Sequence, residues 1–245
     1  MERLRVDWRV ATVAEVVDET AHARTLVLDV DGWPGHVAGQ HADVRLTAED
    51  GYQAQRSYSI ASAPEDEHVA LTIERLEDGE VSPYLAGEAG AGDQFELRGP
   101  IGGHFTWRAE HGGPLLLVGG GSGLVPLMAM LRHRAAQRST AAASLLVSSR
   151  TVEDILYHEE LARLGRDDGL VVHHTLTRGA PAGWTGFDGR VDAEMLAAVG
   201  PAPSEAPRTF VCGPTPFVEA VADLLVGLGH GPASIHAERF GPTGG

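Results

Sequence analysis

Residues 53–62 read QAQRSYSIAS and place a cation, an aromatic ring and several hydroxyls on a stretch typical of a β-strand. Successive side chains of a strand point to opposite faces, so Arg56 and Tyr58 share one face and Ser57 and Ser59 the other. A guanidinium pairs well with phosphate, and an aromatic ring stacks on a flat ligand. The stretch therefore favours a binding site for a large, flat, phosphorylated ligand. An exposed strand with ordinary polar residues is the alternative.

Composition and charge narrow the class of protein. The chain has 245 residues, of which 43% are hydrophobic and 22% charged, as expected of a globular protein of one or two domains. Its net charge of −15 argues against binding to nucleic acid or to anionic membranes. No apolar run approaches the roughly 20 residues of a membrane span, and the N-terminus is charged rather than signal-like, so we expect a cytoplasmic protein.

Cysteine and histidine usage limits the metal chemistry. Cys212 is the single cysteine, which excludes a disulfide within the chain and a cluster held by four of its cysteines. The twelve histidines show neither HExxH nor paired-cysteine spacing, so we predict no metal site.

The first part of the chain has a hydrophobic pattern with a period of two. Short runs of this pattern, separated by Gly, Pro and Asp, predict a closed antiparallel barrel of six strands. The expected strands are Val10–Val17, Thr25–Asp29, His41–Leu46, Gln53–Ser62, Val69–Arg75 and Gln94–Arg98.

The pattern changes after residues 110–114, and strands then alternate with helices. This alternation predicts a doubly wound parallel sheet, so we place a domain boundary between residues 1–110 and 111–245. The expected strands are Pro114–Gly119, Ser144–Ser149, Leu170–Thr177 and Thr209–Cys212, with a further strand-like segment at Ser234–Ala237. The expected helices are Leu124–Gln137, His158–Leu164, Ala193–Val199 and Pro216–Leu228.

Two glycine-containing turns are candidate anion sites. Residues 79–82 read GEVS and open a short helix, whose N-terminus favours an anion; a helix cap with Pro83 at its first position is the alternative. Residues 115–118 form a buried strand that runs into GGGSG at residues 119–123 and then into a helix. Strand, glycine turn and helix together are typical of a pyrophosphate-binding unit, although the spacing is not GxGxxG. A tight strand–helix turn is the alternative here.

RxYS at residues 56–59, GxxS at 79–82, the glycine-rich turn at 119–123 and CGP at 212–214 follow one another along the chain. In this order they resemble the motifs of the ferredoxin–NADP reductase superfamily, and the resemblance extends from end to end. It implies an N-terminal six-stranded antiparallel Greek-key β-barrel that binds flavin, followed by a Rossmann-like parallel sheet, with helices on both faces, that binds NAD(P).

The resemblance also implies the flavin ligands. Arg56 would pair with the flavin phosphates, Tyr58 would pack on or beside the isoalloxazine ring, and Ser59 would reach its reactive N5 edge. The remaining expected ligands are Ser57, Gly79, Val81 and Ser82. We favour FAD over FMN because both the Arg56 strand and the Ser82 turn are present to hold a pyrophosphate.

The nicotinamide site is expected across the carboxyl ends of the parallel strands. Cys212 ends a strand there, and the resemblance places it against the nicotinamide ring; a buried cysteine acting as a small hydrophobe is the alternative. Glu238 lies in a segment, AERF at 237–240, that brings a carboxylate toward the flavin in this family; a surface ion pair is the alternative. Ser59, Cys212 and Glu238 are the expected catalytic residues. The expected nicotinamide-cofactor ligands are Gly119, Gly120, Gly121, Ser122, Gly123, Cys212, Gly213 and Pro214. Phe240, in the segment that approaches the flavin, is a further expected cofactor-binding residue.

The ends of the next two strands bear on the choice of nicotinamide cofactor. Hydroxyls and a cation, Ser148 and Arg150, stand where an NAD-binding unit usually carries a carboxylate, and Arg178 follows the third strand. We therefore expect NADPH rather than NADH. Glu153 and Asp154 lie beyond the expected position; the alternative is that they begin the next helix. Some relatives carry a lysine for the cofactor phosphates where this chain has Gly103, followed by His104.

The resemblance implies a flavin-dependent NAD(P)H oxidoreductase that passes single electrons to a separate acceptor, such as a ferredoxin or a mono- or dioxygenase component. The separate acceptor is expected because this sequence carries no iron–sulfur domain. Two alternatives stay open: an NAD(P)H:flavin reductase that releases reduced flavin, and an electron-transfer subunit that works only within a larger complex.

Overall fold

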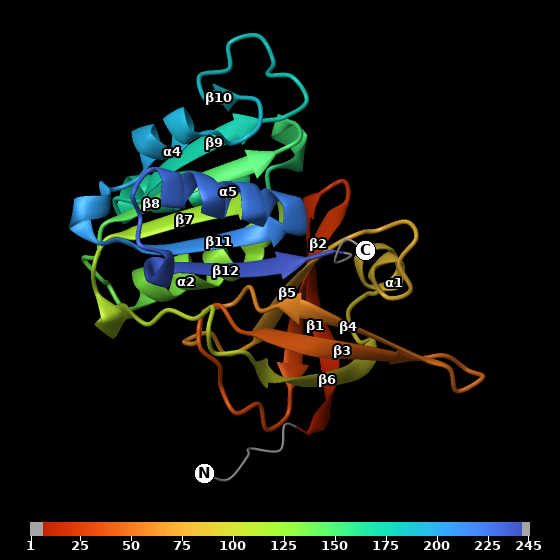
Figure 1. The fold of residues 1–245 in the computed structure, drawn as a ribbon. Coiled ribbons are helices and arrows are strands. Elements are labelled where there is room, and N and C mark those ends of the chain that lie inside the picture. The colour runs from red at the N-terminus through yellow and green to blue at the C-terminus, as the bar shows by residue number, and fades with distance from the viewer. Residues whose placement is uncertain (1–6, 242–245) are drawn as a thin grey trace.

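A computed structural model describes residues 7–241 of the chain. Residues 8–101 build a six-stranded antiparallel sheet in the order β4-β3-β6-β1-β2-β5 (Figure 1). Its strands are β1 (Trp8–Thr20), β2 (Ala23–Val30), β3 (His41–Thr47), β4 (Gln53–Ser59), β5 (Val69–Glu74) and β6 (Gln94–Ile101). An antiparallel bridge from Ile60, just after β4, to Leu71 of β5 joins the two outer strands. The predicted Greek-key barrel is thus confirmed.

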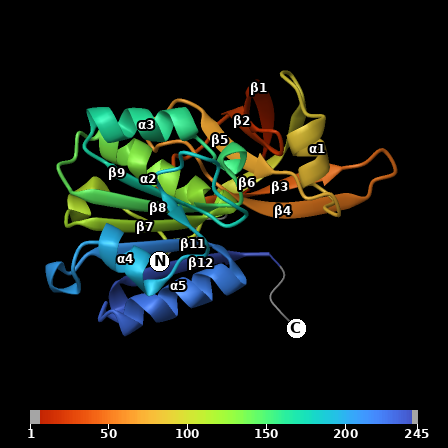
Figure 2. The same cartoon turned by 90° about the horizontal axis from the view of Figure 1, so that it is seen from above.

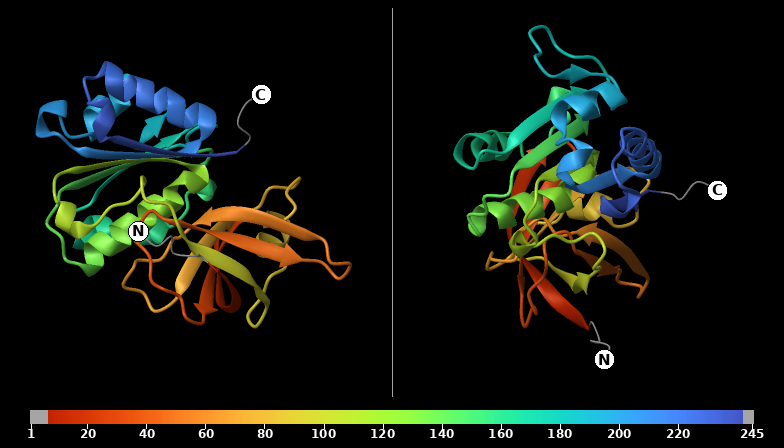
Figure 3. Two further views of the ribbon diagram at one scale, coloured as in Figure 1. Left: turned by 60° about the horizontal axis from the view of Figure 1, so that its bottom comes forward. Right: turned by 60° about the vertical axis from the view of Figure 1, so that its left-hand side comes forward.

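The barrel is filled by the side chains that the period-two pattern directs inward. Ala11 and Val13 of β1, Leu26 and Leu28 of β2 and Ile73 of β5 are almost completely buried in one cluster. Helix α1 (Ser82–Gly87) covers one end of the barrel, and its Leu85 joins the same cluster. The β3–β4 hairpin projects beyond the rest of the barrel (Figure 3).

The second part of the chain forms a six-stranded parallel sheet in the order β10-β9-β8-β7-β11-β12. Helices α2 and α3 lie on one face and α4 and α5 on the other (Figure 2). Every residue of the two strands β7 and β8 is buried, as expected for a parallel sheet covered on both faces. The strands are β7 (Leu115–Gly120), β8 (Ala143–Ser149), β9 (Val171–Leu176), β10 (Phe187–Asp188), β11 (Arg208–Pro214) and β12 (Ile235–Phe240). The helices are α2 (Leu124–Ala136), α3 (His158–Asp167), α4 (Ala193–Val199) and α5 (Thr215–Gly227).

Three details differ from the sequence-based expectation. β4 ends at Ser59, because the chain leaves the β3 partner there and continues as the bridge to β5. Strand β7 continues one residue further than expected, to Gly120, and the turn itself is the 3-10 segment η2 (Gly121–Gly123). The two-residue strand β10 was missed, since two residues carry no periodic pattern.

The barrel and the parallel sheet share one hydrophobic cluster. Ala38, Ala61 and Trp107 from the first part pack with residues of α2 and β7, such as Leu127 and Leu117. Continuous burial across the junction holds the two parts in a defined relation. The domain boundary near residue 110 stays a prediction.

Candidate functional site

The two predicted phosphate-binding segments meet at one end of the barrel. Arg56 on β4 donates from Nη2 to Glu80 Oε2 at 2.5 Å and from Nη1 to the Gln55 carbonyl at 2.7 Å. The Tyr52 hydroxyl donates to the other carboxylate oxygen of Glu80 at 2.6 Å. RxYS and GxxS, which are separated by about twenty residues of sequence, are therefore adjacent in space, and the carboxylate of Glu80 joins them.

The hydroxyl of Ser82 stabilises the turn that precedes α1. Its Oγ accepts a hydrogen bond from the Leu76 backbone N–H at 3.1 Å, and the side chain is buried. A Cβ at Gly79 would lie 2.7 Å from this oxygen, which explains the glycine. Val81 is fully buried, and a helix does begin here, but no side chain caps it and Pro83 is its second residue rather than its first. A role for Gly79, Val81 and Ser82 in binding phosphate stays a prediction.

The remaining residues of RxYS have different surroundings on the two faces of β4. Ser57 donates to Asp43 Oδ1 at 2.6 Å, and Asp43 is paired with Arg98 at 2.6 Å, so Ser57 belongs to a polar network between strands. Tyr58 packs against the barrel core, and burial raises the pKa of its hydroxyl to about 12. Ser59 lies opposite His41 in the β3–β4 ladder.

A cavity of about 830 Å³ opens beside the Arg56–Glu80 pair. Tyr52, Glu80 and Tyr84 line it together with Arg45 and Glu96, so it offers aromatic rings and hydrogen-bonding groups. Its volume is within the range of roughly 300–1,000 Å³ usual for sites of drug-sized ligands and cofactors. None of the predicted flavin ligands lines this cavity, and its one guanidinium, that of Arg45, is paired with Glu96.

The glycine turn after β7 is shaped by close backbone contacts. A Cβ at Gly123 would lie only 2.1 Å from the carbonyl oxygen of Cys212, so the turn can pack on β11 only with glycine there. Gly121 has φ of +55°, and the atom nearest to its missing Cβ is Glu74 Oε2, at 3.9 Å. Ser122 is partly exposed between them. The turn leaves open space above Gly121 and leads directly into the N-terminus of α2, as a dinucleotide pyrophosphate requires.

Cys212 and Glu238 are direct neighbours across the ladder between β11 and β12, and Cys212 also lies opposite Gly119 of β7. Cys212 is almost completely buried, and burial, reinforced by the Glu238 carboxylate, raises the pKa of its thiol well above the usual value. The thiol is therefore neutral at physiological pH. Gly213 and Pro214 complete β11, and Phe240, which pairs with Pro214, is 38% exposed at the end of β12.

His41 links the barrel to this strand pair. Its Nδ1 lies 3.7 Å from Glu238 Oε1, and its backbone pairs with Ser59. The other carboxylate oxygen, Glu238 Oε2, is buried and makes no hydrogen bond within residues 7–241. The structure thus brings the three predicted catalytic residues, Ser59, Cys212 and Glu238, to one junction.

Sequence reasoning did not select His41. The available signal was GQH at residues 39–41, immediately before a strand that pairs with RxYS. Gly39 has φ of +96°, and a Cβ there would lie 2.0 Å from the Phe105 carbonyl oxygen, so this segment is fixed sterically as well.

Ser148, Arg150 and Arg178 gather where β8 and β9 end. Arg178 donates its backbone N–H to the Arg150 carbonyl at 2.9 Å, so the two arginines are neighbours, and both are exposed. Neither forms an ion pair with another residue in the part of the chain that the structure describes. Ser148 is buried near the end of β8. Asp154 accepts hydrogen bonds from the backbone N–H and hydroxyl of Thr151 and ends the 3-10 turn Val152–Asp154, whereas the next α-helix, α3, begins only at His158.

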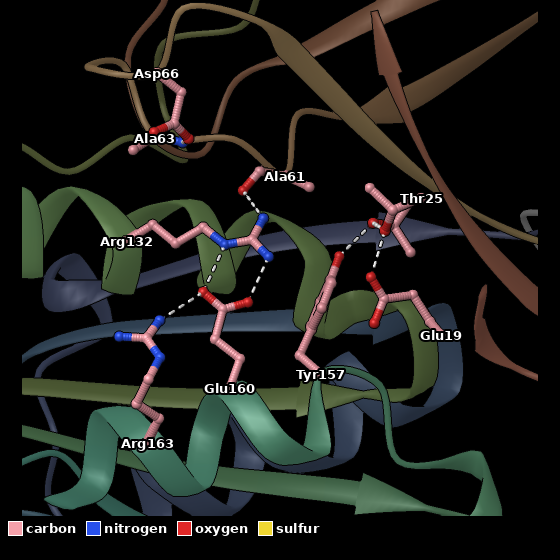
Figure 4. A network of polar contacts seen from close by, with 10 residues as sticks. Glu19, Thr25, Ala61, Ala63, Asp66, Arg132, Tyr157, Glu160 and Arg163 are labelled. Carbon is pink, nitrogen blue, oxygen red and sulfur yellow. Dashed lines mark hydrogen bonds and ion pairs between the residues drawn. The ribbon is translucent and has the colours of Figure 1, made fainter. Parts of the chain in front are cut away.

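A polar network fastens the loop after β8 to the barrel (Figure 4). The Tyr157 hydroxyl donates to Thr72 of β5, whose hydroxyl lies 2.7 Å from that of Thr25, and Thr25 donates to Glu19 at 2.6 Å. Tyr157 holds the left-handed conformation, with φ of 54°, that few non-glycine residues adopt. The barrel therefore holds a strained residue of the other part of the chain in place.

Arg132 of α2 completes the same network. Its guanidinium donates to the Ala61 carbonyl at 2.8 Å and to Glu160 Oε2 at 2.6 Å, and it lies over the Tyr157 ring at 5.0 Å (Figure 4). These contacts fix the position of the parallel sheet relative to the barrel. Hydride transfer between two bound rings requires such a fixed geometry.

The two parts of the chain each match the family model of an oxidoreductase domain. The sequence profile of the oxidoreductase FAD-binding domain matches residues 9–107, and that of the oxidoreductase NAD-binding domain matches residues 117–223. Ferredoxin–NADP reductase B of Sorangium cellulosum is 37% identical over 212 residues, which cover 83% of this chain and 84% of that protein. The chain belongs to the ferredoxin–NADP reductase superfamily.

One further relative is longer than this chain, and another similar protein is known from a crystal structure. The glycine betaine monooxygenase reductase subunit of Pseudomonas aeruginosa is 34% identical over 84% of this chain and 56% of its own length. The chain therefore spans little more than half of that relative. The FAD/NAD-binding domain of nitric oxide dioxygenase from Vibrio cholerae superimposes with a TM-score of 0.85 and 26% identity over 96% of this chain and 99% of that domain. Among the described residues, no helix has the length and apolarity needed to cross a membrane.

Proposed function

We propose that the chain is an FAD-dependent NAD(P)H oxidoreductase that delivers single electrons to a separate redox partner. The observation that carries the proposal is the junction at which Ser59 and His41 of the barrel meet Glu238 and Cys212 of the parallel sheet. The barrel contributes the residues proposed to bind flavin, and the parallel sheet contributes those proposed to bind the nicotinamide cofactor. The two sets of residues meet at this junction.

The residues of the chain have separable roles in this proposal. Arg56 and the turn at residues 79–82 bind the flavin phosphates, Tyr58 and Ser59 position the ring, and the turn at 121–123 binds the nicotinamide dinucleotide. Cys212 supports the nicotinamide as a neutral thiol, and Glu238, whose Oε2 has no protein partner among the described residues, is available to hold a proton. Bound FAD supplies the chemistry, which is to accept a hydride and to release electrons one at a time.

The partner is proposed to be a ferredoxin or an oxygenase component. Support comes from the names of relatives, which include the glycine betaine monooxygenase reductase subunit and the ferredoxin reductase component of 3-ketosteroid-9-alpha-monooxygenase from Rhodococcus rhodochrous. We propose a cytoplasmic location and a division of the chain into a flavin domain, 1–110, and a nicotinamide domain, 111–245.

An absorption spectrum of the purified protein, followed by anaerobic titration with NADPH and NADH, tests the proposal. We expect a flavin spectrum that is bleached by one equivalent of reduced nicotinamide. A protein that binds no flavin after reconstitution with FAD would contradict the proposal.

A flavin reductase that uses FAD as a dissociable substrate is the second candidate. The observation that favours it is the pairing of Arg56 with Glu80, which leaves the predicted phosphate ligand without a net positive charge. Retention of the flavin colour through prolonged dialysis would contradict this second candidate and leave the first in place.

A further inference from the structure

Arg56 is the proposed ligand of the flavin phosphate, yet both of its terminal nitrogens already donate hydrogen bonds. Nη2 is bound to Glu80 and Nη1 to the Gln55 carbonyl, at 2.5 and 2.7 Å. A bidentate phosphate contact uses two neighbouring N–H groups of the guanidinium. The Glu80 carboxylate thus occupies part of the surface of Arg56 that a phosphate would bind.

Charge strengthens this conflict. Arg56 and Glu80 together are neutral, and the other two arginines around the cavity and its adjoining turn are paired as well, Arg45 with Glu96 and Arg75 with Glu77. A flavin phosphate that approached this pair would meet a carboxylate of like charge within contact distance of its cation. Repulsion of this kind weakens anion binding even in a partly hydrated site.

The Tyr52 hydroxyl donates to Glu80 Oε1 and so holds the carboxylate toward Arg56. The pair can nevertheless open, because the Arg56 and Glu80 side chains are 53% and 48% exposed. An exposed ion pair contributes little stability, and a charge-assisted bond to phosphate is stronger. The pair therefore attenuates phosphate binding without preventing it.

We propose that Glu80 competes with the flavin phosphate for Arg56 and thereby lowers the affinity of the protein for phosphorylated flavins, while leaving its affinity for the flavin ring unchanged. This proposal rests on the proposed function, in which Arg56 is a phosphate ligand. It makes Glu80 a residue that shifts the balance from tightly held flavin toward exchanging flavin.

The test compares three flavins that share the ring system and differ in the phosphate. Riboflavin carries none, FMN carries one and FAD carries a pyrophosphate. Each is titrated into the full-length protein freed of flavin, and the dissociation constant is obtained from the change in flavin fluorescence. Glu80→Gln keeps the shape and the Tyr52 contact but removes the charge.

We expect Glu80→Gln to tighten FAD and FMN by about fivefold, or about 1 kcal/mol, and to leave riboflavin unchanged. Glu96→Gln is the matched control, because it removes a paired carboxylate from the same cavity without contacting Arg56. In an Arg56→Ala background, Glu80→Gln should give no gain, since the cation for which the two anions compete is absent.

Several results would overturn the proposal: unchanged or weaker FAD binding by Glu80→Gln, an equal gain for riboflavin, or an equal gain from Glu96→Gln. Failure of the wild-type protein to bind any of the three flavins is a different outcome. That result removes the proposed function itself and the proposal about Glu80 with it.

Discussion

Cys212 is a core residue that also lies at the predicted site. It is 1% exposed and packs in the cluster shared by the two parts of the chain, yet its neighbours across the ladders are Glu238 and Gly119, which lies in β7 shortly before the glycine turn. The two interpretations that the sequence left open are thus compatible. A buried neutral thiol next to a carboxylate suits a packing and polarising role rather than a nucleophilic one.

The first prediction concerns the reactivity of this thiol. Because thiolate is the reactive form and burial raises the pKa of Cys212, we expect iodoacetamide to modify the native protein much more slowly than the urea-unfolded protein at neutral pH. Mass spectrometry of timed samples measures the labelled fraction. Comparable labelling rates in the two states would show that the thiol is accessible and ionised.

At the residue scale, the sequence indicated which side chains carry the chemistry but not what they contact. Arg56 stands out as a phosphate ligand from its strand, whereas its pairing with Glu80 depends on how the β5–α1 loop folds back onto β4. His41 carries no distinctive pattern of its own. Its importance arises from a pairing with Ser59 on one strand and an approach to Glu238, which lies about two hundred residues away in sequence. Contacts of this range are set by the fold as a whole.

At the scale of elements, the nucleotide turn is held by its fit against β11. The second prediction is that Gly123→Ala destabilises the protein by about 3 kcal/mol, because the new methyl group would overlap the Cys212 carbonyl. Gly227→Ala, at the end of α5, is the control: nothing lies within 4 Å of its Cβ position, so we expect no loss and a gain of up to about 1 kcal/mol in helix propensity. Urea unfolding measures both, and equal stabilities would refute the steric argument.

The third prediction concerns the choice of nicotinamide cofactor, which depends on the ends of β8 and β9. Exposed Arg150 and Arg178 lie side by side there, and Ser148 stands where an NAD-preferring unit usually has a carboxylate. We expect catalytic efficiency to be higher with NADPH. Arg150→Ala and Arg178→Ala should each reduce the efficiency with NADPH and spare NADH.

Arg166→Ala serves as the control for these two variants, since this arginine is equally exposed but lies at the far end of α3. It should leave both efficiencies unchanged. A wild-type preference for NADH of tenfold, or about 1.4 kcal/mol in transition-state binding, would be incompatible with this assignment.

Elements with a clear period were predictable, and elements without one were not. Alternation indicated all six barrel strands, and continuous apolar runs indicated β7 and β8, because burial on one face or on both leaves those patterns in the sequence. The positions at which strands end were less predictable. β4 stops at Ser59 although the sequence continues to alternate, since the bridge from Ile60 to β5 begins there.

On the scale of the whole molecule, the relation between barrel and sheet depends on buried polar contacts that sequence patterns do not reveal. A series of side-chain hydrogen bonds links Glu19, Thr25 and Thr72 of the barrel to Tyr157 of the other part (Figure 4). Burial raises the pKa of Glu19, so protonation relieves the cost of burying this carboxylate, and its contribution to stability rises as the pH falls through the raised pKa. Histidines elsewhere act in the opposite direction.

The fourth prediction is that mild acid destabilises the fold through these histidines. Burial lowers the pKa of five histidines, and that of His174, beneath α3 near His158 and Trp184, falls to about 4. The unfolded chain then binds protons more readily than the folded chain. The stabilisation is therefore complete above the unfolded pKa of about 6.5 and is lost as the pH falls toward the lowered values.

His174 alone should account for about 1 kcal/mol between pH of about 7.5 and about 5.5, after allowance for its partial exposure. Urea unfolding at both pH values measures the loss, and His174→Gln, which cannot titrate, should show a smaller one. A free energy of unfolding that is equal at the two pH values in the wild-type protein would contradict the prediction, and an undiminished loss in His174→Gln would assign the effect to the other histidines.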